Sequence, residues 1–86
     1  MQINFSKTFR KQYNKAPKKI QQSFDKRFKI FIKDSSSSVL NNHSLGGSLK
    51  GLKSINITGD WRAIYSQIDS RIIVFEILGT HSQLYK

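Results

Sequence analysis

The spacing of apolar residues changes partway along this chain, and that change limits the possible folds more than any other feature. Up to residue 34, aromatic side chains recur every three or four positions, as they do along one face of a helix. From residue 55 onward, β-branched and aromatic residues form short runs that are typical of strands. A helical first half and a β-rich second half together predict a two-layer α+β fold.

The first half predicts a short strand over residues 1–4 and then two helices. Ser6 suits the N-cap of the first helix, and Pro17 suits the first turn of the second. Asp34 and the serines that follow it should end the second helix. The two helices are expected to form an antiparallel hairpin whose apolar stripe is core. The stripe comprises Phe5, Phe9, Tyr13, Ile20, Phe24, Phe28 and Phe31.

The second half predicts three strands after a polar connection over residues 35–47. Ile55 and Ile57 belong to the first of these strands, which ends at a turn over residues 58–60. Residues 61–68 and 71–78 form the other two. The predicted order is therefore β-α-α-β-β-β, with an N-terminal helical hairpin packed on a small, mostly antiparallel sheet. With 86 residues, the chain has material for one domain, 1–86.

Asp69 and Ser70 are predicted to be a two-residue hairpin loop, which fixes a register. If Ile68 pairs with Arg71, then Arg62 faces Ile77. By the same count, Asp60 faces Gly79 and Thr58 faces His81. Arg62, Asp60 and His81 would then project from the same face at one end of the ladder, because paired side chains share a face. A one-residue slip would move them apart.

Charge points to a polyanionic partner. The chain has 15 basic and five acidic residues, a net charge of +10, and residues 1–34 alone contribute +8. Such a field attracts nucleic acid, although lysines on amphipathic helices also form ordinary solvated faces. The absence of cysteine suits a reducing compartment, so the cytoplasm is expected. The longest aliphatic or aromatic run, Ile72 to Phe75, is far too short for a membrane span.

Two histidines and an aspartate are the candidate proton carriers. His43 lies in the polar connection and His81 at a strand end, and histidine titrates near neutral pH. Asp60 is placed to orient or deprotonate a reacting group, or simply to form a turn. Two distant histidines with few carboxylates make a poor metal site, so no metal or cofactor is expected.

Three cations and one aromatic residue complete the candidate site. Lys50, Lys53 and Arg62 can clamp a phosphate, or can be solvated strand ends. Tyr85 can stack on a base, whereas Trp61 and Tyr65 are expected in the core. RNA supplies its own nucleophile, the 2′-hydroxyl, so a base, an acid and cations suffice to cleave it.

Several motifs of this chain resemble the RelE/ParE superfamily of bacterial type II toxins, most closely its RelE/StbE and YafQ-like branch. The two basic helices also look like those of the family, so the resemblance covers nearly the whole chain. The motifs are Asn42-His43-Ser44-Leu45, Leu49-Lys50-Gly51, Ile55 to Arg62, Ile64-Tyr65, Gly79-Thr80-His81-Ser82 and Leu84-Tyr85.

The resemblance implies the RelE-like fold and a toxin that cleaves mRNA in the ribosomal A site. It also implies a cognate antitoxin, which for a +10 toxin is expected to be acidic and partly disordered, and a hetero-oligomer of the two. In YafQ-like members, the residues corresponding to His43, Asp60, His81 and Tyr85 belong to the active site. His81 is then the suggested general acid, and Asp60 or His43 the base or its orienter.

Two departures from the family pattern keep other functions open. Asn56 stands where some YafQ-like toxins carry a further histidine, and Ile77 stands near where some carry an arginine. The first removes a proton carrier, and the second removes a cation that Arg62 or Lys53 would have to replace. The alternatives are a ParE-like inhibitor of DNA gyrase and a catalytically silent module that binds RNA or antitoxin.

Overall fold

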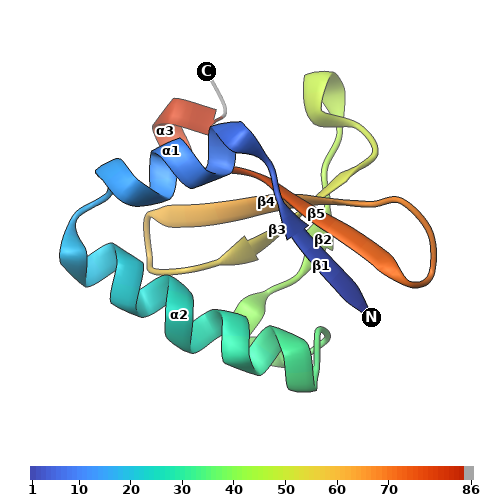
Figure 1. Ribbon diagram of the computed structural model, residues 1–86. Coiled ribbons are helices and arrows are strands. Elements are labelled where there is room, and N and C mark those ends of the chain that lie inside the picture. Colours follow the sequence, from blue (N-terminus) through green and yellow to red (C-terminus); the bar gives the residue numbers. More distant parts are fainter. Residues whose placement is uncertain (85–86) are drawn as a thin grey trace.

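The computed structural model describes residues 1–84, in which a five-stranded sheet carries two helices on one face (Figure 1). The strand order is β1-β5-β4-β3-β2, and only the β1–β5 pair is parallel. The predicted α+β fold class, with a helical hairpin packed on a mostly antiparallel sheet, is confirmed. The strands are β1 (Gln2–Phe5), β2 (His43–Ser44), β3 (Leu52–Asn56), β4 (Trp61–Gln67) and β5 (Ile72–Thr80). The helices are α1 (Lys7–Lys15), α2 (Lys18–Lys33), α3 (His81–Leu84) and the 3-10 turns η1 (Ser38–Leu40) and η2 (Gly47–Leu49).

Four elements were absent from the predicted order because each is too short to show a periodicity. β2, α3 and the two 3-10 turns have two to four residues each. They lie in the polar connection, just after it, or at the end of the described chain. None of the helices within residues 1–84 combines the length and the hydrophobicity that a membrane span requires.

The two long helices begin as the sequence predicts. The Ser6 hydroxyl accepts from the backbone N–H of Phe9 at 3.0 Å, and so caps α1. It also donates to the Glu76 carbonyl at 2.9 Å, and this bond ties the start of α1 to β5. Pro17 directly precedes α2 and accepts from the N–H of Ile20 at 2.9 Å.

Phe75, in the centre of β5, is the hub of the core. It is fully buried, and its ring centroid lies 5.7 Å from Phe9 of α1, 5.4 Å from Phe31 of α2 and 5.5 Å from Tyr65 of β4. Tilted and edge-on rings at these distances interact favourably beyond the area they bury. The predicted aromatic stripe is therefore the layer that joins the helices to the sheet.

The predicted register of the β4–β5 hairpin is wrong at two places. The N–H of Ile68 donates to the Ile72 carbonyl at 2.9 Å, so the connection has three residues, 69–71, rather than two. The Asp69 carboxylate closes this turn by accepting from the N–H of Arg71 at 2.7 Å. A bulge follows at Ile64/Tyr65, where the extra residue of β5 is Glu76.

Together the two shifts displace β5 by two residues relative to β4. The side chains near Arg62 therefore keep the predicted face of the sheet, but each has a different partner from the one predicted. Arg62 faces Gly79 instead of Ile77. The N–H of His81 donates to the Asp60 carbonyl at 2.9 Å, which places His81 opposite Asp60 instead of Thr58. Side chains alternate with a period of two, so a shift of two residues restores the original face.

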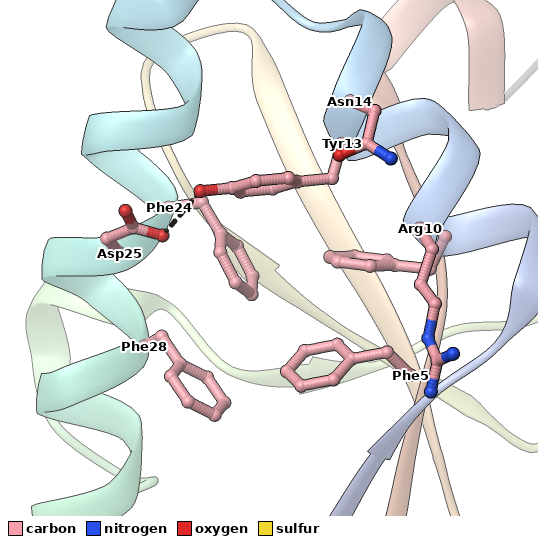
Figure 2. Close-up of a pocket in the computed structure, with 8 residues that line it drawn as sticks. Phe5, Arg10, Tyr13, Asn14, Phe24, Asp25 and Phe28 are labelled. Carbon is pink, nitrogen blue, oxygen red and sulfur yellow. Dashed lines mark hydrogen bonds between the residues drawn. The ribbon is translucent and has the colours of Figure 1, made fainter.

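A groove of about 420 Å³ opens between α1 and α2 (Figure 2). Rings from β1 and both helices line it, among them Phe5, Tyr13 and Phe28, which are only half-buried. The Tyr13 hydroxyl donates to the Asp25 carboxylate at 2.9 Å across the groove. Burial, and then the Asp25 carboxylate, raise the pKa of Tyr13 above its usual value.

Candidate active site

Strand pairing places His43 and Arg62 on the face of the sheet that points away from the helices. His43 of β2 lies opposite Ser54 of β3, and Arg62 of β4 lies opposite Asn56. Ile55, between Ser54 and Asn56, belongs to the core beneath the helices. Because neighbouring strand residues point to opposite faces, these four polar residues share the other face.

A cavity of about 360 Å³ on this face brings three predicted site residues together. His43, Arg62 and His81 line it, with Asn41 and Leu45 completing the wall. The three predicted residues come from β2, β4 and the first position of α3, so only the folded sheet makes them neighbours. In one place, the two imidazoles can accept and donate protons, and the guanidinium can hold negative charge.

Arg62 is held in position by the turn that precedes β4. One of its terminal nitrogens, Nη1, donates to the carbonyls of Thr58 at 2.9 Å, Gly59 at 3.2 Å and Trp61 at 3.1 Å. Carbonyl oxygens carry partial negative charge and leave the guanidinium charge uncancelled. The turn thus keeps a cation at the wall of the cavity.

Asp60, Lys50 and Lys53 are not among the residues that line this cavity. Asp60 is an exposed turn residue, and its backbone carbonyl accepts a hydrogen bond from the N–H of His81. Lys53 pairs with the core residue Tyr65 and therefore lies on the opposite, helix-facing side of the sheet, where it lines a cavity of about 380 Å³ that His43 also borders. Lys50 is exposed next to η2 and lines neither cavity. Tyr85 lies outside the described residues.

Two polar atoms on the site face are buried without a partner among residues 1–84. They are the Ser54 hydroxyl oxygen and the Asn56 side-chain oxygen Oδ1. An unpaired buried polar atom costs free energy, so such atoms are rare in folded proteins. Both lie in β3, directly opposite His43 and Arg62 respectively.

Sequence reasoning assigned no role in the site to the two residues that precede His43, although Asn42 belongs to a motif that carries the family resemblance. Asn41 has a left-handed backbone, with φ of 46°, and its carbonyl oxygen lies 2.8 Å from Nδ1 of His43. The Asn42 side chain contacts the hydroxyl of Tyr65 at 2.7 Å. The available signal was the Asn-Asn pair itself, because asparagine adopts the left-handed conformation more readily than most residues.

Comparison with known proteins identifies the family. The family model for YafQ, described as the bacterial toxin of a type II toxin-antitoxin system, matches residues 1–86. A search of curated protein sequences gives no match to this chain.

Solved structures of toxins have the same fold. YafQ from E. coli matches with a TM-score of 0.82 and 25% identity, over 98% of this chain and 97% of that chain. A chain of the E. coli DinJ-YafQ toxin-antitoxin complex matches with a TM-score of 0.79 and 26% identity, over 98% and 96%. The toxin-antitoxin complex RelBE2 from Mycobacterium tuberculosis matches in fold, with a TM-score of 0.72 and 22% identity, over 93% and 96%. Because the family model spans the whole chain, this protein belongs to the YafQ family of toxins from bacterial type II toxin-antitoxin systems.

Proposed function

We propose that this toxin is an endoribonuclease that cleaves mRNA on the ribosome and thereby blocks translation. The observation that supports this most is the cavity in which His43, Arg62 and His81 meet. It combines two groups that transfer protons near neutral pH with one permanent cation. Cleavage of RNA through its own 2′-hydroxyl needs these groups and no others.

The proposed reaction is an in-line transfer at phosphorus. A base removes the proton of the 2′-hydroxyl, and the 2′-oxygen forms a bond to phosphorus. The bond from phosphorus to the 5′-oxygen of the next nucleotide breaks, and an acid donates a proton to that oxygen. The products are a 2′,3′-cyclic phosphate and a free 5′-hydroxyl. We assign His43 as the base and His81 as the acid, with Arg62 holding the negative charge of the phosphate.

The remaining predicted residues have supporting roles in this proposal. Asp60 would orient His81, since their backbones are hydrogen-bonded. Lys53, beside the cavity on the helix-facing side, and the exposed Lys50 would hold flanking phosphates of the mRNA. Tyr85 would stack on a base.

The test is primer extension on a defined mRNA in bacterial ribosomes, with and without the ribosomes. We expect A-site cleavage by the wild type, and loss of cleavage in His81→Ala and Arg62→Ala. Arg71→Ala is the matched control, because Arg71 is an exposed arginine at the opposite end of the same hairpin. It removes the same charge far from the cavity and should cleave normally.

Other outcomes separate the alternatives. Equal loss in Arg62→Ala and Arg71→Ala would mean that net charge, not the cavity, matters. Cleavage that survives His81→Ala would refute the assignment of the acid. Absence of cleavage by folded wild type, with inhibition of gyrase supercoiling instead, would favour the ParE-like function. RNA binding with neither activity would favour a silent module.

We also propose that the antitoxin is acidic and partly disordered before it binds. α1 and α2 carry ten of the 15 basic residues and only one acidic residue, Asp25. Tightly wrapped acidic segments neutralise such a surface, and their association weakens as salt rises. The candidate partner is the product of the neighbouring gene, and calorimetric titration at low and high salt tests it. The proposal fails if the two proteins do not bind at low salt.

A further inference from the structure

The backbone at Asn41 aims a carbonyl at the ring of His43. Asn41 is the single non-glycine residue within 1–84 that has a positive φ, 46° with ψ of 48°. It terminates η1, where its N–H donates to the Ser38 carbonyl at 3.2 Å. This reversal of the chain brings the Asn41 oxygen to 2.8 Å from Nδ1 of His43.

That contact determines where the proton of a neutral His43 resides. A carbonyl oxygen can only accept, so Nδ1 must carry the hydrogen. Neutral imidazole has a single N–H, and Nε2 therefore keeps its lone pair. His43 is exposed and lines the cavity, so this lone pair belongs to a ring within reach of a substrate. After Nε2 accepts a proton, the same carbonyl stabilises the imidazolium through a charge-assisted hydrogen bond.

Asn42 connects this loop to the rigid core. Its Nδ2 donates to the Ser35 carbonyl at 2.9 Å and to the Tyr65 hydroxyl at 2.7 Å, and that hydroxyl lies 3.0 Å from Asn42 Oδ1. Tyr65 is 2% exposed, and its ring packs edge-on against Phe31 at 5.1 Å. The anchor is thus a side chain that has no room to move.

Asn42 stands between the two partners of the contact, which are the carbonyl of residue 41 and the ring of residue 43. Holding residue 42 against Tyr65 therefore fixes both ends of the hydrogen bond. A loop without this anchor would sample several backbone conformations, and the His43 ring could then adopt either tautomer.

We propose that Asn41 and Asn42 are positioning residues that make His43 the general base of the site. Asn41 holds the proton on Nδ1, and Asn42, anchored to Tyr65, keeps that arrangement in place. The proposal deepens the proposed nuclease function and rests on it for its catalytic part. The tautomer of His43 can be measured without any activity.

The first experiment is NMR of ¹⁵N-histidine-labelled toxin at a pH where the rings are neutral. We expect His43 of the wild type to be the Nδ1–H tautomer, and Asn42→Ala and Tyr65→Phe to shift it toward the Nε2–H form. His81 is the internal control, and its tautomer should not change. An Nε2–H ring in the wild type, or an unchanged tautomer in both variants, would overturn the proposal.

Substitutions of Asn41 test the backbone part of the argument. Asn41→Gly keeps the left-handed conformation accessible and should retain the Nδ1–H tautomer. Asn41→Val disfavours that conformation and should lose it. Equal behaviour of the two variants would contradict the role of the Asn41 carbonyl. Circular dichroism of each variant checks that it is folded, and Tyr65→Phe, which keeps the ring, remains informative if Asn42→Ala unfolds.

The second experiment is single-turnover cleavage of ribosome-bound mRNA. General bases contribute roughly a hundredfold or more to rate, so Asn42→Ala should slow the chemical step by about tenfold to a hundredfold, without weakening substrate binding. In a His43→Ala background, Asn42→Ala should have no further effect. Additive losses would show a merely structural role. If the wild type does not cleave at all, the proposed function fails, while the NMR result still decides the positioning role.

Discussion

Replacement of Ser54 by alanine should stabilise this protein, contrary to the usual effect of changing a buried residue. Ser54 is 0% exposed, and its hydroxyl oxygen has no hydrogen-bond partner within the described residues. Burying a hydroxyl without a partner costs about 1–3 kcal/mol. Alanine removes that cost, and the void it leaves is smaller than a methyl group, which limits the loss of packing to less than about 1 kcal/mol. The free energy of unfolding should therefore rise by about 1 kcal/mol.

Urea unfolding followed by circular dichroism measures this change. For a chain of this length, about 1 kcal/mol corresponds to a rise in Tm of roughly 4–8 °C. The matched control is Ser66→Ala in the neighbouring strand, because the Ser66 hydroxyl donates to the Glu76 carboxylate at 2.8 Å. Loss of that bond should destabilise the protein by about 0.5–1.5 kcal/mol.

A destabilised Ser54→Ala would refute this reasoning, because it would mean that the hydroxyl has a partner in solution. A variant that is more stable and yet cleaves mRNA more slowly would indicate that the Ser54 hydroxyl has a role in the reaction. Ser54 lies opposite His43, so its unpaired hydroxyl would then serve the substrate at a cost in stability.

Three further predictions concern the cap, the site and alkaline pH. Ser6→Ala should lower the free energy of unfolding by about 1 kcal/mol, measured by urea unfolding, because α1 loses its N-cap; no change would show that the cap is dispensable. Asn56→His should raise the single-turnover cleavage rate by about tenfold or more, since it adds a proton carrier opposite Arg62; an unchanged rate would show that this position needs no proton carrier. Burial raises the pKa of Tyr65, opposed by the hydrogen bond to Asn42, so the folded chain keeps this proton to a higher pH than the unfolded chain, whose tyrosines titrate near about 10. The contribution of Tyr65 to the free energy of unfolding should therefore be fully present below about pH 10 and decrease as the pH rises above it. The decrease in stability should be smaller in Tyr65→Phe.

The elements and the core could be predicted from the sequence because their signals are local. A helix buries every third or fourth residue and a strand every second one, so the apolar stripe that ends at Phe31 and the β-branched runs indicate each element wherever it packs. Caps are equally local, since Ser6 acts on an N–H three residues away. The types of residue in the site were also predictable, because imidazole and guanidinium groups have the same chemistry in any fold.

The geometry of the site depended on the tertiary structure, because register and proximity are set by contacts between distant residues. The Asp69 turn and the Glu76 bulge each shifted β5 by one residue, and neither leaves a periodic signal in the sequence. Their sum decided which residues of β5 and α3 stand beside Arg62, and the pairing of β2 with β3 brought His43 to the same cavity. The Asn41 carbonyl and the Tyr65 anchor likewise act through space. Sequence alone determined which elements form and which chemistry is available, and tertiary packing decided which of those groups meet.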